Sequence, residues 1–268
     1  MNRSFAVITA VLGSVVFLGC GGSDDSSGTT STYPYTPGTA DVHTPDGTTT
    51  VGSDSSGCIT TSNGTCIKLP EKCGKDRNAA EIYTDKDGNV LAIVCYPTDG
   101  VTVDPVAEPP VDDLKDGNNS VIVLDGADDG PDVTGDVTLD GNNLTLYGQG
   151  PDVSEIGGNL TITQNNAVVH GLTVDGNVTF EQNGGTISDC VVKGDVYLKH
   201  NNSVVAGCDV WGKIVVTGNN NIVVSNRIQG GFDISGKMGT CENNLSFSDA
   251  NNDKVIQDSE VGAEISCN

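Results

Sequence analysis

The stretch GNLTITQNNAVVHGLTVD (158–175) is the first of four consecutive blocks that share one pattern. It is followed by GNVTFEQNGGTISDCVVK (176–193), GDVYLKHNNSVVAGCDVW (194–211) and GKIVVTGNNNIVVSNRIQ (212–229). Each block begins with glycine and is 18 residues long. Apolar residues recur at positions 3, 5, 12 and 17 of the blocks. The spacing of two between positions 3 and 5, and between positions 15 and 17, predicts strands with one inward face. One block cannot bury its own apolar face, so the blocks must stack on one another.

Stacking at about 4.8 Å pairs every strand with the same strand of the next block. The sequence therefore predicts an all-β fold, a short single-stranded parallel β-helix solenoid with 18-residue coils. A 23-residue block, Gly135–Gly157, precedes the regular ones and has its extra residues around 148–153. Residues 120–124 are expected to start the stack and residues 231–268 to close it, which gives a β-helix domain over 119–268.

The glycine-led pattern, with its paired asparagines and alternating apolar residues, resembles the right-handed parallel β-helix of the pectate-lyase-like superfamily over roughly residues 119–240. The resemblance implies right-handed winding. Left-handed hexapeptide β-helices also use 18 residues per coil and need an aliphatic residue every six. Positions 5, 11 and 17 partly imitate that pattern, as in Ile162, Val168 and Val174, so left-handed winding remains an alternative.

Enzymes of this superfamily place an acidic calcium cluster, or paired carboxylates, with a basic residue in a groove walled by long loops. Lyase or hydrolase chemistry needs such groups within roughly 5–10 Å of each other. No column of the blocks stacks several aspartates, and the regular blocks have no long loops. We therefore expect a non-catalytic structural or adhesion-type module, with a polysaccharide lyase or glycoside hydrolase as the alternative.

Two columns of the repeat carry polar or sulfur-containing residues. The superfamily resemblance implies that the asparagines at position 8 form an inward structural ladder of hydrogen bonds, and these are Asn165, Asn183, Asn201 and Asn219. Cys190 and Cys208 occupy position 15 in adjacent coils, where a separation near 4.8 Å is compatible with a disulfide. A disulfide is the favoured interpretation, and two small buried thiols are the alternative.

The N-terminus has the features of an export signal. Arg3 precedes an uncharged, largely apolar run over residues 5–19, which has the length of a signal-peptide core. The run ends in Phe17-Leu18-Gly19-Cys20, which resembles the lipobox of bacterial lipoproteins and implies cleavage before a lipidated Cys20. We expect a signal peptide over 1–19 and a lipid anchor in the cell envelope, at the outer membrane of a Gram-negative bacterium. An ordinary signal peptide is the alternative.

Residues 20–57 are rich in serine, threonine, glycine and aspartate, which predicts a disordered tether. Residues 58–97 are predicted to form a Cys-rich minidomain that contains a β-hairpin around Asp85–Asn89, and residues 98–118 an acidic, proline-rich linker. Asp85, Asp87 and Asn89 also resemble the start of a calcium loop, but the later ligands are missing and a plain turn is favoured.

The chain has 9 cysteines. Setting Cys20 aside leaves an even number, which in an exported chain favours disulfides. The candidates are Cys58, Cys66, Cys73, Cys95, Cys190, Cys208, Cys241 and Cys267. Cys241 and Cys267 are expected to clamp the C-terminal cap, and the other pairings stay open. No cysteine or histidine spacing indicates a zinc site.

The formal net charge of −23 excludes a nucleic-acid partner, because binding to phosphates needs a basic surface. The expected partners are the membrane, reached through the N-terminal lipid, and an extracellular glycan or surface protein. The sequence does not determine the oligomeric state. No cofactor is required, although calcium is compatible with the acidity.

One outward face of the repeat, at positions 16, 18 and 2, is the best candidate for binding. It carries Asp175, Lys193, Asp195, Asp209, Trp211, Lys213 and Arg227. Trp211 is the only tryptophan, and the pattern predicts that it is exposed and able to stack on a sugar. The alternative is structural, because opposite charges one coil apart stabilise the strand register.

The segment 125–140 is the densest run of carboxylates. Asp125, Asp128, Asp129 and Asp132 are candidate ligands for Ca²⁺ at the N-terminal edge of the solenoid. The favoured alternative is a charged cap that prevents edge-to-edge association. His43, His170 and His200 lie far apart in the sequence, and no Ser/His/Asp or Cys/His triad can be argued from them.

Overall fold

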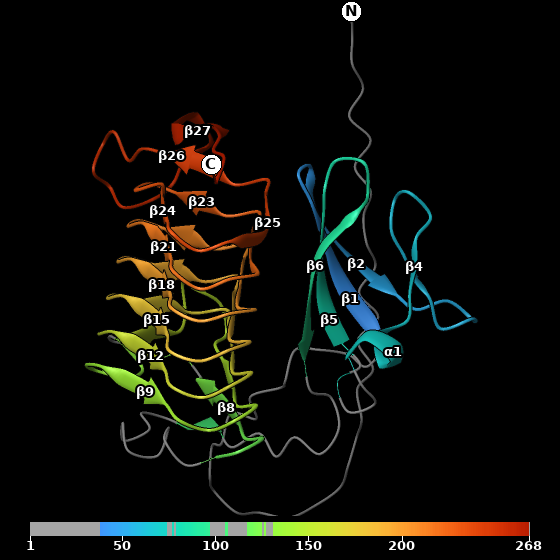
Figure 1. Cartoon of the computed structure of the whole chain (residues 1–268), viewed down its shortest axis with the longest axis horizontal. Coiled ribbons are helices and arrows are strands. Elements are labelled where there is room, and N and C mark those ends of the chain that lie inside the picture. The colour runs from blue at the N-terminus through green and yellow to red at the C-terminus, as the bar shows by residue number, and fades with distance from the viewer. Residues whose placement is uncertain are drawn as a thin grey trace, which may run out of the picture. The chain divides into compact units, whose positions relative to one another are not determined.

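The structure is a computed structural model that describes residues 38–73, 77, 79–96, 105–106, 117–124, 126 and 131–267. The signal peptide and Cys20 lie outside these residues. No helix among the described residues is long and apolar enough to cross a membrane. The chain folds into short strands, and from residue 121 onward these stack as a parallel solenoid (Figure 1).

Three sheets, here called S1, S2 and S3, form the sides of the solenoid. S1 contains β9 (Val137–Leu139), β12 (Leu160–Ile162), β15 (Val178–Phe180), β18 (Val196–Leu198), β21 (Ile214–Val216) and β24 (Phe232–Ile234). S2 contains β7 (Pro105–Val106), β8 (Val121–Leu124), β10 (Thr145–Tyr147), β13 (Val168–His170), β16 (Thr186–Ser188), β19 (Val204–Ala206), β22 (Asn221–Val224) and β25 (Met238–Glu242). S3 contains β11 (Glu155–Ile156), β14 (Thr173–Val174), β17 (Val191–Val192), β20 (Asp209–Val210), β23 (Arg227–Ile228), β26 (Leu245–Phe247) and the antiparallel β27 (Val261–Glu264).

The strand register confirms the 18-residue coil. Leu160 pairs with Val178, which pairs with Val196, and so on through S1. In the preceding coil Val137 pairs with Leu160, 23 residues later, and the extra residues lie between β10 and β11, where the sequence placed them. The repeat continues for one coil beyond residue 229, because β24, β25 and β26 keep the register. This register is common to both hands of winding, so right-handedness stays a prediction.

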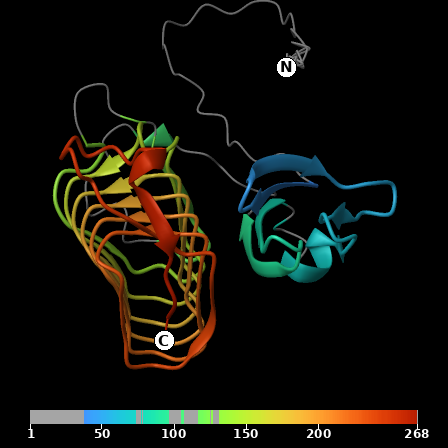
Figure 2. The same cartoon turned by 90° about the horizontal axis from the view of Figure 1, so that it is seen from above.

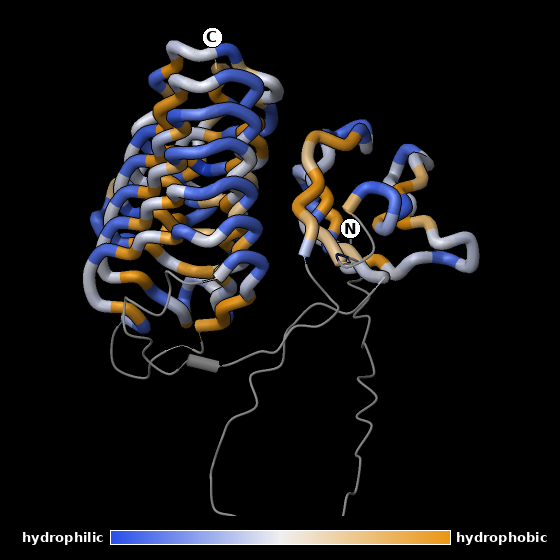
Figure 3. Tube along the Cα trace, turned by 60° about the horizontal axis from the view of Figure 1, so that its bottom comes forward, coloured by the Kyte–Doolittle hydropathy of each residue, from blue (hydrophilic) through white to orange (hydrophobic). Residues whose placement is uncertain are grey.

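The inward positions form one continuous apolar core. In β15 the flanking Val178 and Phe180 are fully buried while Thr179 between them is partly exposed. Seen from above, the coils lie over one another as similar loops (Figure 2), and hydrophobic and hydrophilic segments alternate around each coil (Figure 3). The alternation of two residues thus produces the core that the sequence pattern requires.

The turn between S2 and S3 requires a left-handed residue at position 14 of each coil. This column contains Gly171, Asp189, Gly207, Ser225 and Asn243, all with φ between 49° and 66°. Glycine, asparagine and aspartate adopt this conformation most readily. Gly207 has a second constraint, because a Cβ there would lie 2.8 Å from the hydroxyl oxygen of Tyr83.

The asparagine column at position 8 runs along a corner of the solenoid and does not point into the core. The backbone amide of Asn201 donates to Asn183 Oδ1 at 3.2 Å, and that of Asn219 donates to Asn201 Oδ1 at 2.8 Å. Asn219 is exposed and Asn165, Asn183 and Asn201 are partly exposed. The hydrogen bonds along the stack confirm a structural ladder for Asn183, Asn201 and Asn219. Its expected inward orientation is wrong, because position 8 lies in the turn that follows the last S1 residue.

An inward ladder exists at position 15. Asn226 and Asn244 are fully buried, and the side-chain amide of Asn226 donates to Asn244 Oδ1 at 2.9 Å. The same column holds the two thiols in the preceding coils. Each amide also donates to a core-facing carbonyl, Asn226 to Val205 O at 3.0 Å and Asn244 to Val223 O at 2.8 Å, so these buried groups are satisfied.

Cys190 and Cys208 are buried free thiols, so the favoured disulfide is wrong. Stacked coils project these side chains in parallel into the core, whereas a disulfide needs Cβ atoms that face each other. Each sulfur lies within 3.3 Å of a backbone carbonyl oxygen, Ser188 O for Cys190 and Ala206 O for Cys208. The other pairs are Cys58–Cys66, Cys73–Cys95 and Cys241–Cys267, and the last joins the cap as expected.

A second assembly precedes the solenoid and is here called the N-terminal sheet. Its strand order is β2-β1-β5-β6. Its elements are β1 (Thr39–Thr44), β2 (Gly47–Gly52), β5 (Ala79–Thr84) and β6 (Val90–Tyr96), with β3 (Ile59–Thr60), β4 (Cys66–Ile67) and the short helix α1 (Leu69–Cys73) between β2 and β5. The β5–β6 hairpin confirms the prediction for this segment, and Asp85 accepts the amides of Asp87 and Asn89 in a plain turn.

The predicted disordered tether is wrong for residues 39–52. β1 pairs with β2 through the turn that contains Pro45, Asp46 and Gly47, and it pairs in parallel with β5. Ala40 and Val42 of β1 are buried, and this burial offsets the entropy cost that a polar segment alone could not offset. The linker prediction is likewise wrong for residues 105–106, which form β7 beside β8.

Candidate functional site

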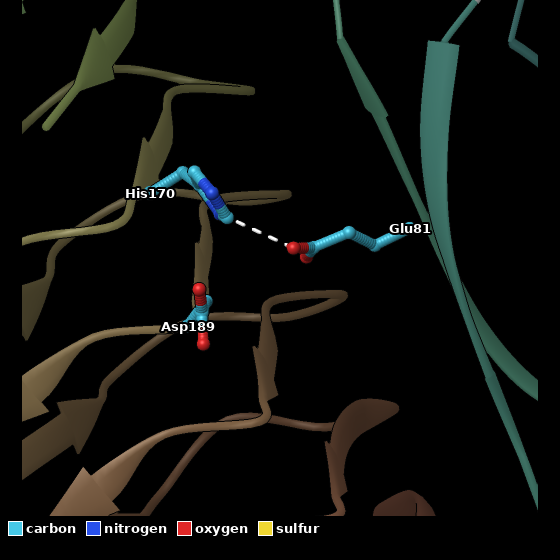
Figure 4. Close-up of side chains that lie close together, drawn as sticks. All are labelled: Glu81, His170 and Asp189. Atoms are coloured by element: carbon cyan, nitrogen blue, oxygen red, sulfur yellow. Dashed lines mark ion pairs between the residues drawn. The ribbon is translucent and has the colours of Figure 1, made fainter. Parts of the chain in front are cut away.

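A buried polar cluster surrounds Glu81 of β5. The carboxylate oxygen Oε2 accepts hydrogen bonds from the hydroxyls of Tyr83 and Tyr96, both at 2.9 Å. The other oxygen, Oε1, lies 3.5 Å from His170 Nδ1 of the solenoid and 3.7 Å from His43 Nε2 of β1. Figure 4 shows the side chains of Glu81 and His170 pointing toward each other.

The cluster continues on the outer side of S2. Tyr96 Oη lies 2.8 Å from Ser188 Oγ and 3.0 Å from His170 Nδ1. The ring of Tyr147 stacks on that of His170, with centroids 5.1 Å apart. Ala79, Tyr83 and Tyr96 also share an apolar cluster with solenoid residues that include Val168 and Val224, so both assemblies contribute to one buried environment.

The electrostatics of this cluster favour an ionised Glu81. Burial alone would raise the pKa of Glu81, but His170, His43 and the Tyr83 hydroxyl outweigh it and hold the pKa at about 2. Burial alone would lower the pKa of His43, but Glu81 outweighs it and the pKa lies above its usual value. The pKa of Asp189 is raised, first by burial and then by the charge of Glu81.

The geometry does not suit catalysis. A Ser/His/acid triad needs the serine and the acid on different imidazole nitrogens, but Ser188 and Glu81 both face Nδ1 of His170. Ser188 and Glu81 are also buried, at 0% and 2% exposure. Glu81, His170 and Asp189 have atoms within 4.8 Å of one another, yet two tyrosine hydroxyls already occupy one oxygen of Glu81. The cluster is a hydrogen-bonded ion network that the sequence did not predict.

The predicted binding face is mostly a set of charge pairs between neighbouring coils. Lys193 forms ion pairs with Asp175 and with Glu155, the latter at 3.4 Å. Arg227 forms a two-bond pair with Asp209. These contacts agree with the structural alternative, in which charges stabilise the register.

Asp195 does not pair with the Lys213 ammonium. It accepts the backbone amide of Lys213 at 2.7 Å and the Tyr197 hydroxyl at 2.8 Å. Trp211 is half-buried, and not fully exposed as the pattern predicts, because its ring packs edge-to-face against Phe247 with centroids 5.1 Å apart. Phe247 belongs to the coil that the repeat alignment did not include.

The acidic segment is described only in part, because Asp125, Asp128 and Asp129 lie outside the described residues. Asp132 is buried, with 3% exposure, and accepts the backbone amides of Gly126 and Glu155, each at 2.8 Å. Both of its carboxylate oxygens therefore satisfy backbone groups at the edge of the solenoid.

A different segment matches the calcium-loop pattern at every side-chain ligand position, although not at its glycine. Residues 249–260 read DANNDKVIQDSE, and oxygen-bearing side chains stand at positions 1, 3, 5, 9 and 12. These are Asp249, Asn251, Asp253, Gln257 and Glu260. The twelve-residue calcium loop takes its ligands from these positions and from the backbone carbonyl at position 7. The sequence interpretation missed this loop because position 6, where the pattern has glycine, is Lys254.

The backbone of this segment turns as the calcium-loop pattern requires. Lys254 has φ of 61° and so adopts the left-handed conformation for which glycine is preferred at position 6. Asp249 accepts the backbone amides of Asp253 at 3.2 Å and Lys254 at 3.1 Å. Asp253 in turn accepts the amide of Val255 at 2.9 Å. In the first half of the loop, the carboxylates of Asp249 and Asp253 therefore hold the backbone amides that follow them.

The second half of the loop brings the carboxylate of Glu260 close to those of Asp249 and Asp253. Glu260 ends the 3₁₀-helix η2 (Asp258–Glu260) and accepts the backbone amides of Ala250 at 2.9 Å and Gln257 at 3.2 Å. The loop is held at both ends, because β26 and β27 flank it and pair in antiparallel fashion. The disulfide between Cys241 and Cys267 closes the same cap.

Three carboxylates of this segment converge at one place. Asp249, Asp253 and Glu260 each offer an oxygen, and these oxygens all lie within 4.8 Å of one another. Two oxygens that bind one Ca²⁺ at 2.3–2.6 Å can be at most about 5.2 Å apart. Three equidistant oxygens around one ion are at most about 4.5 Å apart, so the three carboxylates lie close to the spacing that one ion requires. The side-chain amides of Asn251 and Gln257 donate to Asp253 Oδ2 at 2.8 and 3.0 Å, so both side chains face the same carboxylate.

Comparison of the chain with protein-family models, with curated proteins and with solved structures found no match. The functional argument therefore depends on the residues of this chain alone.

Proposed function

We propose that this protein is a non-catalytic, adhesion-type module of the cell envelope that binds Ca²⁺ through the loop at residues 249–260. The observation that carries the proposal is the match of all five side-chain ligand positions of the calcium loop, together with the convergence of Asp249, Asp253 and Glu260 within 4.8 Å. Bound Ca²⁺ would neutralise the carboxylates of Asp249, Asp253 and Glu260 and would order the loop at the C-terminal cap.

The location in the envelope is part of the same proposal. Its support is the apolar run over 5–19 and the lipobox-like sequence that ends at Cys20. Lipidation there would anchor the chain at the outer membrane, with a glycan or surface protein as the partner of the folded part. A right-handed, pectate-lyase-like solenoid is the architecture we propose for that part.

Calcium titration by isothermal calorimetry tests the loop. We expect one site with Kd of about 10⁻⁴ M, in the range of extracellular modules, and Glu260→Gln is expected to weaken it by at least about 100-fold because it removes a charged ligand. Asp258→Asn is the matched control, since it changes the same charge at position 10, which is not a ligand position, and it should alter Kd by less than about threefold. Equal losses of Ca²⁺ affinity in both variants would contradict binding at the ligand positions of the loop and would indicate a nonspecific charge effect.

The enzymatic alternative, a polysaccharide lyase or glycoside hydrolase, requires that the protein release product from a polysaccharide. Polysaccharides incubated with the protein, with and without Ca²⁺, should yield no new reducing ends and no unsaturated products. Product formation would contradict the non-catalytic part of the proposal and favour a lyase or hydrolase.

A further inference from the structure

A pocket of about 340 Å³ lies between the outer side of S3 and the calcium loop. The solenoid contributes Val191, Lys193, Trp211 and Gln229, and the loop contributes Asp249, Asn252 and Lys254. The volume is at the lower end of the range for small-molecule sites. Trp211 and the loop are thus two walls of one cavity, although they are separated by some forty residues of sequence.

Trp211 provides a fixed aromatic wall. Its ring packs at 84° against the buried ring of Phe247, and its backbone amide donates to Val192 O at 2.9 Å. The side chain is half-buried, so the rest of its surface is available to the pocket. A rigid aromatic surface at a polar cavity suits the C–H face of a pyranose ring, because apolar area is buried without loss of side-chain freedom.

Both walls offer hydrogen-bonding groups that suit hydroxyls, with Gln229 on the solenoid wall and Asn252 and Lys254 on the loop. Gln229 and Asn252 carry amides that both donate and accept, and Lys254 carries three donors. Lys254 occupies a left-handed position that costs roughly 1–2 kcal/mol for a residue with a Cβ. Burial alone would raise the pKa of Asp175 of the solenoid, but the charges of Lys193 and Lys254 lower it, which agrees with the place of Lys254 in the lining of the pocket.

The charge around the pocket favours a neutral ligand. Lys193 and Lys254 bring two positive charges to the pocket. They are offset by the carboxylates of Asp249 in the lining and of Asp175 and Glu155 beside it. The chain as a whole carries a formal net charge of −23, which repels polyanions. A uronate or sulfated glycan would meet this repulsion, whereas a neutral hexose or N-acetylhexosamine would not.

We infer that this pocket binds a neutral pyranose saccharide, stacked on Trp211 and hydrogen-bonded by Gln229, Asn252 and Lys254, and that Ca²⁺ promotes this binding. The calcium dependence rests on the proposed function, because Asn252 and Lys254 lie between the loop residues that bind the ion. An ion that orders the loop also positions these two side chains. By linkage the saccharide must raise the affinity for Ca²⁺ by the same factor.

A glycan array probed with the full chain tests the inference. With about 1 mM Ca²⁺ present, a concentration above the expected Kd, we expect binding to neutral hexose or N-acetylhexosamine glycans in preference to uronate and sulfated ones. EGTA and Trp211→Ala should each weaken this binding by at least about tenfold. Lys254→Gly separates the two functions, because it relieves the backbone cost and should keep or improve Ca²⁺ affinity while glycan binding falls at least about fivefold.

The outcomes distinguish the two ideas. The saccharide site is overturned if the protein binds Ca²⁺ but no neutral glycan, or if Trp211→Ala and Lys254→Gly leave glycan binding unchanged. Neither result would contradict Ca²⁺ binding by the loop. Glycan binding that depends on Trp211 but not on EGTA, in a chain that shows no calorimetric calcium site, overturns the calcium loop and its linkage.

Discussion

Glu81→Ala is expected to lower the free energy of unfolding by about 3–5 kcal/mol, the cost of removing one partner from a buried ion network. The substitution leaves the hydroxyls of Tyr83 and Tyr96 without their acceptor, and it removes the negative charge that faces His43 and His170. Chemical denaturation followed by circular dichroism measures the change.

Glu71→Ala is the matched control for this loss. Its side chain is 72% exposed, and its one ion pair among the described residues is with Lys68, at 3.6 Å. The free energy of unfolding should therefore change by less than about 0.5 kcal/mol. A similar small change in Glu81→Ala would mean that the cluster does not contribute to stability.

The same cluster predicts how stability depends on pH. The pKa of Glu81 falls from its usual 4.5 to about 2 on folding, so its contribution of about 3 kcal/mol is present above pH 4.5 and is lost as the pH falls toward 2. The raised pKa of Asp189 offsets part of this acid loss. The pKa of His43 shifts upward on folding, opposite to that of Glu81. The contribution of His43 to the free energy of unfolding is therefore lost as the pH rises through its folded-state pKa.

The stability should therefore be greatest between about pH 4.5 and 6.5, near the unfolded-state pKa values of the two groups. Glu81→Gln should remove most of the acid limb, as measured by denaturation at a series of pH values. An acid limb of unchanged steepness in this variant would assign the loss to other carboxylates.

Phe180→Ala is the second substitution with a large expected effect, a loss of about 3–5 kcal/mol. Phe180 lies in β15 with 0% exposure and contributes to the continuous core of the solenoid. Each coil is stabilised by its two neighbours, so a cavity in a middle coil weakens contacts on both sides. Denaturant unfolding followed by Trp211 fluorescence reports this loss, because Trp211 lies in the next coil of the solenoid.

Val153→Ala provides the comparison, since Val153 is 50% exposed and lies in the extra segment of the long coil. Its effect should stay within about 0.5 kcal/mol. Equal effects of the two substitutions would show that the inward face of β15 is not a packed core.

The solenoid could be predicted from the sequence because its information is local and repeated. The glycines at 158, 176, 194 and 212 establish the coil length, and the alternation at Leu160 and Ile162 establishes which face is inward. Even the position of the extra residues in the long coil follows from aligning one block with the next. The orientation of position 8 could not be read in this way, because a repeated asparagine is equally compatible with a corner and with the core.

The N-terminal sheet was harder to predict because its decisive contacts are not local. The turn at Pro45, Asp46 and Gly47, between segments rich in β-branched residues, was a signal for β1 and β2. The parallel pairing of β1 with β5 and the convergence of His43 and His170 on Glu81 depend on tertiary packing, which no spacing in the sequence reveals.

The proposed calcium loop could be recognised from the sequence, but a single residue departs from the usual pattern. Ligand positions 1, 3, 5, 9 and 12 are all present in residues 249–260, whereas Lys254 replaces the glycine by which such loops are usually recognised. The φ of 61° at Lys254 shows that the backbone accepts the required conformation without glycine.

Terbium luminescence is the most direct test of the proposed calcium site, because Tb³⁺ prefers the same oxygen ligands as Ca²⁺ and emits strongly when a nearby tryptophan absorbs. Trp211 is the only tryptophan and lines the same pocket as Asp249 of the loop. We predict sensitised emission that Ca²⁺ competes away, that Glu260→Gln abolishes and that Trp211→Phe greatly reduces. Absence of sensitised emission, or emission that persists undiminished in Glu260→Gln, would contradict a calcium site in this loop.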